Sequence, residues 1–248
     1  MTSRLRSHLR LLPIRARKAV ALARTPSHWR AARAGVVAAV EHRKVPLGGP
    51  YATVLDVGAS RGQFALHATQ RYPDARVLCF EPLRTSQDVL RRVLGSRVTI
   101  VPTAVGAEPG TAVLHVAAAD DSSSLLPIGT RQRTEFPGTH ETGRIEVPVT
   151  PLSEFLGADL AQPALLKIDV QGLELEVLRG AGDALSRVDT VLVECSFVEL
   201  YEGQALADDV IVHMAQRGFR LAGVYGLATA QNGEALQSDL LFRNLSSV

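Results

Sequence analysis

The sequence predicts an α/β fold built on a mainly parallel sheet, and the ends of two expected strands carry the prediction. An apolar, β-branched run ends in Asp56 and enters a loop that contains Gly58 and Gly62. The apolar residues after this loop have helical spacing over 62–72, and a second apolar run then ends in Glu81. Strand, loop, helix and strand in this order form a βαβ unit, whose two strands lie parallel in one sheet.

The elements continue to alternate along most of the chain. Strands are expected at 52–57, 76–80, 97–101, 111–117, 144–149, 164–169 and 190–194, with helices at 62–72, 84–94, 172–178 and 206–217 and a short helix from Pro151. Residues 219–225 and 236–242 are expected to close the sheet as an antiparallel pair. Alternation of this kind predicts a sheet that helices cover on both faces.

One polar segment, 118–143, interrupts the alternation. It is rich in Gly, Ser, Thr and Pro, and a segment of this length in a compact domain is usually functional or mobile. It contains the serine triplet Ser122, Ser123 and Ser124. We expect these serines either to line a binding site with hydroxyl groups or to belong to a flexible loop.

Charge is unevenly distributed over the 248 residues. Residues 1–44 hold eleven Lys and Arg against one acid, Glu41, whereas the remainder holds 16 basic and 24 acidic residues. The sequence predicts a basic helical arm at 1–44, a linker at 45–50 and a single domain at 51–248. The acidic domain is poorly suited to bind nucleic acid. For the arm, packing on the domain or a second subunit, contact with an anionic membrane or acidic partner, and disorder are the alternatives.

The remaining composition indicates a cytoplasmic protein. Cys79 and Cys195 lie in apolar, strand-like runs, which favours buried free thiols and a reducing compartment. No apolar run reaches the roughly 20 residues that cross a bilayer. Basic residues such as Arg15 and Lys18 interrupt the N-terminal apolar stretch, so no secretory leader is expected.

The first loop has the character of a cofactor site. Gly58 allows a sharp turn against a ligand, and Gly62 allows the helix to start close to the strand. Glu81 lies 23 residues beyond Gly58, where an acid at a strand tip holds ribose hydroxyls in nucleotide enzymes. An ordinary strand-to-helix turn is the alternative for this loop taken alone.

The residues around the glycines separate two cofactor classes. A dinucleotide site has the pattern G-x-G-x-x-G, but this chain has D-x-G-x-x-x-G, with Ser60 at the place of the middle glycine. The Asp56 carboxylate, expected to face the loop, would repel a pyrophosphate and suit a ligand that carries an ammonium and a sulfonium. The loop therefore favours S-adenosylmethionine (SAM) over a nicotinamide dinucleotide.

At this point the chain resembles the FkbM-type SAM-dependent methyltransferases. The resemblance covers about 51–243 and departs from the family at Ser60-Arg61. The matching blocks are Asp56–Ala59, Gly62–Phe64, Phe80–Pro82, Ala104–Gly106, Ser122–Leu125, Leu166–Gly172 with Glu174, Val193-Glu194, Tyr201–Gly203 and Gly218-Phe219. The resemblance implies a single Rossmann-like class I methyltransferase domain with a seven-stranded, mostly parallel sheet. It also implies O-methylation, commonly of sugar or natural-product hydroxyls.

Strand ends and the resemblance together give the expected site residues. The cofactor is expected at Asp56, Gly58, Ala59, Ser60, Gly62, Phe64, Glu81, Pro82, Thr103 and Ala104. The acceptor is expected at Ser122, Ser123, Ser124, Gln171 and Glu174.

Asp169 is the first choice for the group that takes or orients the acceptor proton. It and Glu194 end strands expected to be neighbours, and capping of the next helix is the alternative role of Asp169. Glu194 and His140 are the other candidates for catalysis, with His115 a further possible base. Lys167 shares the strand face of Asp169 and needs a carboxylate partner, so it is expected to be structural or charge-tuning.

No metal is expected. Asp169 and Glu194 could hold Mg²⁺ with the acceptor, but no spacing requires it, and nothing resembles a zinc site. The expected function is therefore a SAM-dependent O-methyltransferase acting on a small sugar, glycolipid or natural product. A nicotinamide-dependent oxidoreductase and a catalytically silent SAM-binding module are the alternatives. A homo-oligomer and peripheral membrane contact through residues 1–44 are left open.

Overall fold

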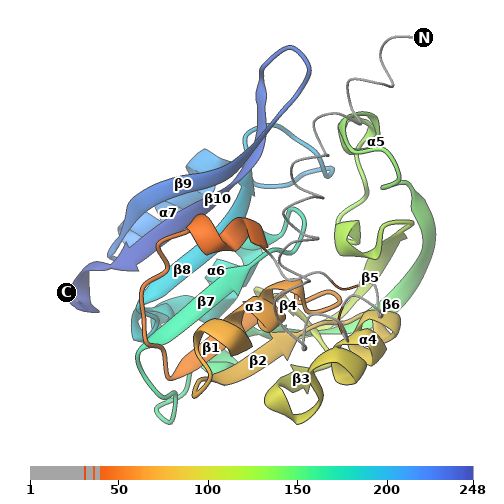
Figure 1. The fold of residues 1–248 in the computed structure, drawn as a ribbon. Coiled ribbons are helices and arrows are strands. Elements are labelled where there is room, and N and C mark those ends of the chain that lie inside the picture. Colours follow the sequence, from red (N-terminus) through yellow and green to blue (C-terminus); the bar gives the residue numbers. More distant parts are fainter. Residues whose placement is uncertain (1–30, 32–35, 37–39, 248) are drawn as a thin grey trace.

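The computed structural model describes Ala31, Val36 and residues 40–247. A seven-stranded sheet forms its centre, in the order β3-β2-β1-β7-β8-β10-β9 (Figure 1). Five strands are parallel, and β10 runs antiparallel to both β8 and β9. The strands are β1 (Thr53–Val57), β2 (Arg76–Phe80), β3 (Thr99–Val101), β7 (Ala164–Ile168), β8 (Thr190–Ser196), β9 (Phe219–Thr229) and β10 (Ala235–Asn244). The predicted fold class and the closing antiparallel pair are confirmed.

Helices cover both faces of this sheet, as the alternation predicted. On one face α3 (Gln63–Arg71) and α4 (Arg84–Leu94) enclose an apolar cluster, and on the other α6 (Glu174–Ala181) and α7 (Ala207–Gln216) enclose a second. Every residue of β1 and β7 is buried. Strands buried on both faces read as continuous apolar runs, which is why the sequence identified them.

A second, three-stranded sheet was not predicted. It consists of β4 (Ala104–Gly106), β6 (Glu141–Pro151) and β5 (Gly110–Ala117), in that order. β4 is parallel and β5 antiparallel to β6. Part of the segment expected as loop 118–143 is regular, with η3 (Asp120–Ser122), α5 (Thr130–Glu135) and the start of β6.

The remaining short elements are 3₁₀ helices. They are η1 (Val40–Lys44), η2 (Gly95–Arg97), η4 (Leu152–Phe155), η5 (Gly182–Arg187) and η6 (Leu245–Ser247). The strand expected from residue 97 begins at Thr99 because η2 occupies the preceding residues. The short helix expected from Pro151 is η4.

Most of the predicted basic arm, residues 1–44, lies outside the described residues. Ala31 and Val36 are fully buried in the cluster beneath α3 and α4. Within the expected linker 45–50, Leu47 is buried, and its carbonyl accepts hydrogen bonds from Tyr51 and Arg243. This stretch therefore packs against the domain.

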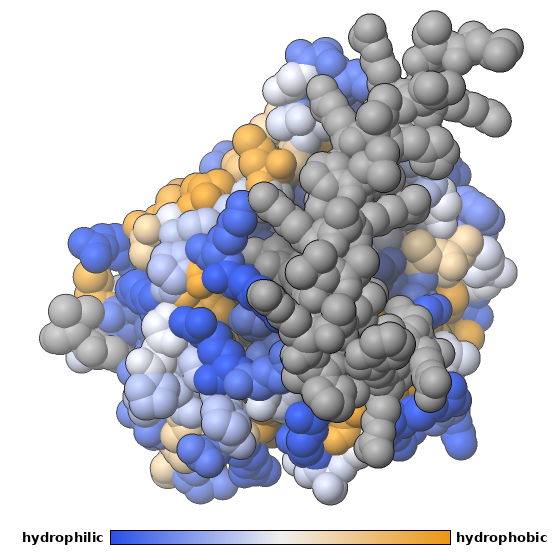
Figure 2. Space-filling model, in the orientation of Figure 1, coloured by the Kyte–Doolittle hydropathy of each residue, from blue (hydrophilic) through white to orange (hydrophobic). Residues whose placement is uncertain are grey.

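Three further findings concern the helices, the cysteines and the exposed apolar residues. In the described part of the chain, every helix is too short or too polar to pass through a bilayer. Cys79 and Cys195 are both buried and free. Exposed apolar side chains lie along the edge strand β9, at Leu221, Val224 and Leu227, and Figure 2 shows this apolar edge in orange at the upper left.

Candidate active site

A cavity that is open to solvent lies at the carboxyl ends of β1, β2 and β7. It brings together ten of the residues that the sequence assigned to cofactor, acceptor or catalysis. They are Gly58, Ser60, Glu81, Pro82, Thr103, Ala104, Ser123, Ser124, Asp169 and Gln171. Asp120 and Asp121, which the sequence did not single out, also line it.

Glu81 is fixed at the end of β2 by two backbone amides. Its Oε2 accepts from the amide of Ser60 at 2.7 Å, and its Oε1 accepts from the amide of Leu83 at 2.7 Å. Burial raises the pKa of Glu81 to about 7, although these two hydrogen bonds oppose the shift. The carboxyl group therefore holds the loop after β1 beside the loop after β2.

The loop after β1 passes extremely close to the loop after β7. Gly58 has a φ of +79°, and a Cβ there would lie 1.8 Å from the carbonyl oxygen of Asp169. The amides of Gly58 and Ala59 both donate to the carbonyl of Phe80. Ser60 adopts a φ of +47°, and its buried hydroxyl has no protein partner. Only glycine fits at position 58 without moving the backbone that carries Asp169.

Asp56, Gly62 and Phe64 lie behind the cavity wall and do not line it. Asp56 is buried in β1, and burial raises its pKa to about 7. Its Oδ2 has no hydrogen-bond partner. Phe64 packs edge-on against His42, with ring centroids 5.3 Å apart.

The close contact at Gly62 differs from the predicted one. A Cβ there would lie 2.7 Å from Leu90 Cδ2, so this glycine lets α3 start close to α4 rather than to the strand. Its φ of +92° also requires glycine.

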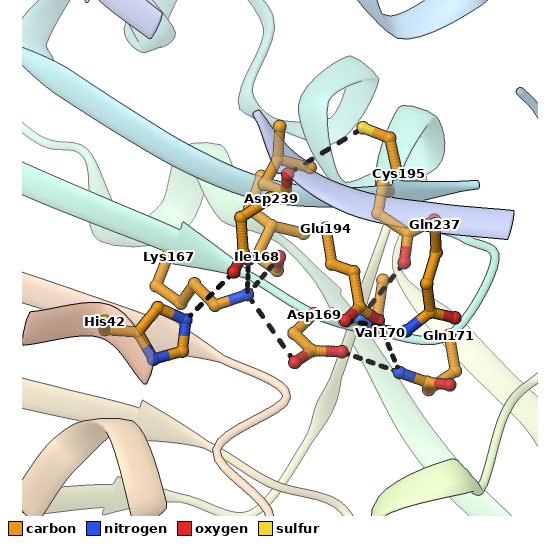
Figure 3. Close-up of polar contacts among 12 residues, drawn as sticks. His42, Lys167, Ile168, Asp169, Val170, Gln171, Glu194, Cys195, Gln237 and Asp239 are labelled. Atoms are coloured by element: carbon orange, nitrogen blue, oxygen red, sulfur yellow. Dashed lines mark hydrogen bonds and ion pairs between the residues drawn. The ribbon is translucent and has the colours of Figure 1, made fainter. Parts of the chain in front are cut away.

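Gln171 connects Asp169, which follows β7, with Glu194, which lies in β8 (Figure 3). Its side-chain amide donates to Asp169 Oδ1 at 2.7 Å and to Glu194 Oε2 at 3.0 Å. Gln237 donates to the other carboxylate oxygen of Glu194 at 2.9 Å. Burial raises the pKa of Glu194 well above its ordinary value, and the neighbouring Asp169 adds to the shift. The two acids that the sequence placed on adjacent strands are thus joined through one side chain.

Capping of the next helix was the alternative role of Asp169, and Glu174 is the first residue of that helix, α6. Its carboxylate accepts from the amides of Val170 and Gly172 at 3.0–3.2 Å. Burial raises the pKa of Glu174 to about 7. Glu174, predicted as an acceptor residue, does not line the cavity, and it holds the turn from which Asp169 and Gln171 project.

Lys167 has the carboxylate partners that its buried position requires. Its Nζ lies 3.5 Å from Asp169 Oδ2 and 3.3 Å from Asp239 Oδ1, and only 2% of its side chain is exposed. Burial alone would lower the pKa of Lys167, but the surrounding carboxylates, Asp169 first, outweigh it and raise the pKa. His42 Nε2 lies 3.3 Å from the other oxygen of Asp239.

Each serine of the triplet Ser122–Ser124 makes a different hydrogen bond at or beside the cavity. Ser124 donates to the carbonyl of Gln171 at 2.7 Å, and Ser123 accepts from the amide of Ala117. Ser122 lies beside the cavity wall, and its carbonyl accepts from the hydroxyl of Tyr201 at 3.0 Å. Gln171 Oε1 lies 2.7 Å from the same hydroxyl, so the two acceptors share its single hydrogen. The sequence analysis did not assign Tyr201 to the site, although it lies in one of the blocks that matched the family.

Neither histidine considered as a base lines this cavity. His140 is exposed, in the segment between α5 and β6. His115 Nδ1 lies 2.7 Å from Glu141 Oε2, within the small sheet. Across the described residues, no three His, Cys, Asp or Glu side chains are grouped to hold a metal ion.

A mostly parallel sheet with acid-ended strands around one cavity is a Rossmann-like arrangement, in which ligands bind at the carboxyl ends of the strands. The family described as "Methyltransferase FkbM domain" matches residues 56–221, and this chain belongs to it.

Two similar proteins show how far the likeness extends. A protein of Beauveria bassiana (strain ARSEF 2860) called Methyltransferase 1 is 29% identical over 160 residues, which are 57% of this chain and 63% of that protein. The chain thus spans less than two thirds of that relative. The 2-O-methyltransferase NoeI of Sinorhizobium fredii (strain NBRC 101917 / NGR234) is 28% identical over 164 residues, 62% of this chain and 68% of NoeI.

Solved structures are more distant. The magnesium protoporphyrin IX methyltransferase of Synechocystis PCC 6803 is 12% identical, covers 88% of this chain and 79% of its own, and has a TM-score of 0.44. The precorrin-6y C5,15-methyltransferase of Geobacter metallireducens GS-15 is 12% identical, covers 83% and 85%, and has a TM-score of 0.43. Similarity at this level carries no argument about the site.

Proposed function

We propose that this protein transfers a methyl group from SAM to a hydroxyl group of a small molecule. The observation that carries the proposal is the shared cavity of Glu81 and Asp169. One acid lies where a nucleotide ribose is held, and the other lies beside Gln171 at the end of a neighbouring strand. A donor and an acceptor bound in this cavity would meet beside Asp169.

The residues of the cavity fit SAM. Glu81 would accept hydrogen bonds from the ribose hydroxyls, and the unpartnered hydroxyl of Ser60 is available nearby. Pro82, Thr103 and Ala104 would flank the nucleoside beyond Glu81. Because the carboxylates of Glu81, Asp120, Asp121 and Asp169 line the cavity, a cationic ligand is favoured there. SAM, when bound, supplies a methyl group activated by its sulfonium.

Asp169 would orient the acceptor hydroxyl and accept its proton. Gln171 and Lys167 hold one carboxylate oxygen each, so the direction of the carboxylate is set before the acceptor binds. A base in this position contributes roughly 10²–10⁴-fold to a rate. The start of α6 has no side-chain cap hydrogen bond, so the carboxylate of Asp169 is not engaged in capping that helix.

The residues on the acceptor side of the cavity favour binding of a molecule rich in hydroxyl groups. Asp121, Ser123, Ser124 and Gln171 offer acceptors and donors there, and a 2-O-methyltransferase is among the relatives. A sugar, a glycolipid or a hydroxylated natural product is the acceptor we propose.

Two measurements test this function. Calorimetry with S-adenosylhomocysteine (SAH) and, separately, with NAD tests the cofactor, and we expect binding of SAH alone. A screen of glycosylated and hydroxylated metabolites with a radiolabelled methyl donor tests the transfer. Tighter binding of NAD would favour the oxidoreductase, and SAH binding without transfer to any acceptor would favour a silent binding module.

Asp169→Asn then tests the role of the carboxylate. It keeps the size and most hydrogen bonds of the side chain, so we expect kcat to fall roughly 10²-fold with SAH affinity nearly intact. Asp88→Asn, which removes an exposed carboxylate on α4, is the matched control and should be neutral. Near-normal turnover in Asp169→Asn would remove the base role from Asp169 and leave Glu194, which bonds to the same Gln171, as the next candidate.

A further inference from the structure

A bridging segment, residues 120–124, connects the cofactor side of the cavity with the acceptor side. At its first residue, Asp120 Oδ2 accepts from Arg61 Nε at 2.7 Å and from the hydroxyl of Ser86 at 3.2 Å. Arg61 follows Ser60 in the loop after β1, and Ser86 lies in the first turn of α4, just beyond Glu81. Asp120 thus joins the loop after β1 to the first turn of α4, close in the chain to Glu81, which is proposed to hold the ribose.

The other end of the bridging segment is joined to the acceptor side. Ser122 accepts from the hydroxyl of Tyr201, and Ser124 donates to the carbonyl of Gln171. Ser124 is 1% exposed and Tyr201 2%. Breaking these hydrogen bonds would leave buried polar groups without partners.

The two ends therefore differ in how easily they open. The side chain of Arg61 is 41% exposed and that of Asp120 18%, so water can replace each partner when the ion pair separates. At the other end Ser124 and Tyr201 are buried, so their hydrogen bonds are replaced by water less readily. Any opening of the cavity along this segment should begin at the Arg61 end.

We propose that Arg61 is a positioning residue of the cofactor site. Through Asp120 it holds the bridging segment across the cavity, and separation of this ion pair admits and releases the cofactor. The inference rests on the proposed binding of SAM. It assigns to Arg61 an effect on the rates of cofactor exchange, while the contacts to the cofactor itself remain those of other residues.

The first test measures association and dissociation of SAH by surface plasmon resonance. In Arg61→Gln both rate constants should rise about 5–10-fold, while their ratio, Kd, changes less than threefold. Arg61→Lys keeps a cation for Asp120 and should remain within twofold of the unmodified protein. Arg91→Gln removes an exposed ion pair with Asp88 on α4 and is the matched control. If only one of the two rate constants changed, and Kd changed with it, the proposal would be overturned.

The second test needs no ligand. The amides of Ser122 and Ser123 donate to the carbonyls of Ala119 and Asp120, so their hydrogen exchange reports opening of the bridging segment. Exchange at residues 121–124 should be faster in Arg61→Gln and unchanged in Arg91→Gln. Unchanged exchange in Arg61→Gln would overturn the positioning role, even if the protein failed to bind SAH. Absence of SAH binding in the unmodified protein would instead count against the proposed function.

Discussion

The buried ammonium of Lys167 lies 3.5 Å from Asp169 Oδ2, at the boundary between the core of the sheet and the cavity. The same ammonium lies 3.3 Å from Asp239, whose pKa is held below its ordinary value, because Lys167 and His42 together outweigh the effect of burial. His42 follows on the far side of Asp239. Asp239, Lys167 and Asp169 thus form a row of alternating charges through the sheet to the proposed base, and His42 of η1 contacts its far end (Figure 3).

Lys167→Met should destabilise the protein by about 3–5 kcal/mol, because it leaves buried carboxylates without their cation. Urea unfolding measures this change. In the double variant Lys167→Met/Asp239→Asn, the loss should be smaller than the sum of the two single losses. Additive losses would show that the Lys167–Asp239 pair contributes nothing as a pair.

Affinity for SAH should rise with pH because of Glu81. Its pKa is raised to about 7, so roughly a tenth of the molecules carry the carboxylate at pH 6 and roughly nine tenths at pH 8. Ribose hydroxyls donate to the ionised form, so Kd should fall about tenfold between these pH values. Calorimetry at each pH measures it. Glu81→Gln should bind more weakly and show a flatter profile, whereas an equal pH dependence in both proteins would remove Glu81 from the ribose site.

Gly58→Ala should lower SAH affinity at least tenfold and lower the melting temperature. The added Cβ would meet the carbonyl of Asp169 at 1.8 Å, in a residue that also has a φ of +79°. Gly218 has the same φ of +79° with nothing within 4 Å, so Gly218→Ala imposes the backbone strain alone. If the two variants behave alike in calorimetry and thermal melts, the close approach to Asp169 has no consequence for the site.

Tyr201→Phe should cost about 1–2 kcal/mol of stability and reduce methyl transfer, with SAH affinity nearly unchanged. It removes the hydroxyl whose single hydrogen is shared by Gln171 Oε1 and the carbonyl of Ser122. Tyr72→Phe is the control, since its hydroxyl donates to the carbonyl of Gly48, away from the cavity. Chemical unfolding and the methyl-transfer assay compare the two, and equal effects on transfer would contradict a role for Tyr201 in the site.

Long apolar runs made most of the fold predictable. The five residues of β1 are all buried, so the run ending in Asp56 was recognisable without any structural knowledge. Helix α4 matches its predicted bounds because its apolar residues repeat with helical spacing. The three residues of β4 are too few to show any period, and their pairing with β6 depends on contacts far along the chain.

The site residues that stand at the ends of strands were predictable from the sequence. Asp169 and Glu81 could be placed in one cavity because parallel strands end at one edge of the sheet. Asp120 lies in the short helix η3 and Tyr201 in the segment between β8 and α7, and the positions of both are set by tertiary contacts such as those to Arg61 and Gln171. The φ of +58° at Gln171 is likewise invisible in the sequence, since it results from the turn that Glu174 holds.

The pairing of β4 with β6 makes the part of the chain between them a separable cassette. Ala104 pairs with Val149 and Gly106 with Pro151, so residues 107–148 leave and rejoin the domain at neighbouring points. This stretch carries the bridging segment and the serines, whereas Glu81 and Asp169 belong to the part that stays behind. The corresponding residues of a related protein could replace this cassette without disturbing the seven-stranded sheet. Acceptor preference could then be exchanged between such proteins while the methyl donor and the base remain those of the recipient.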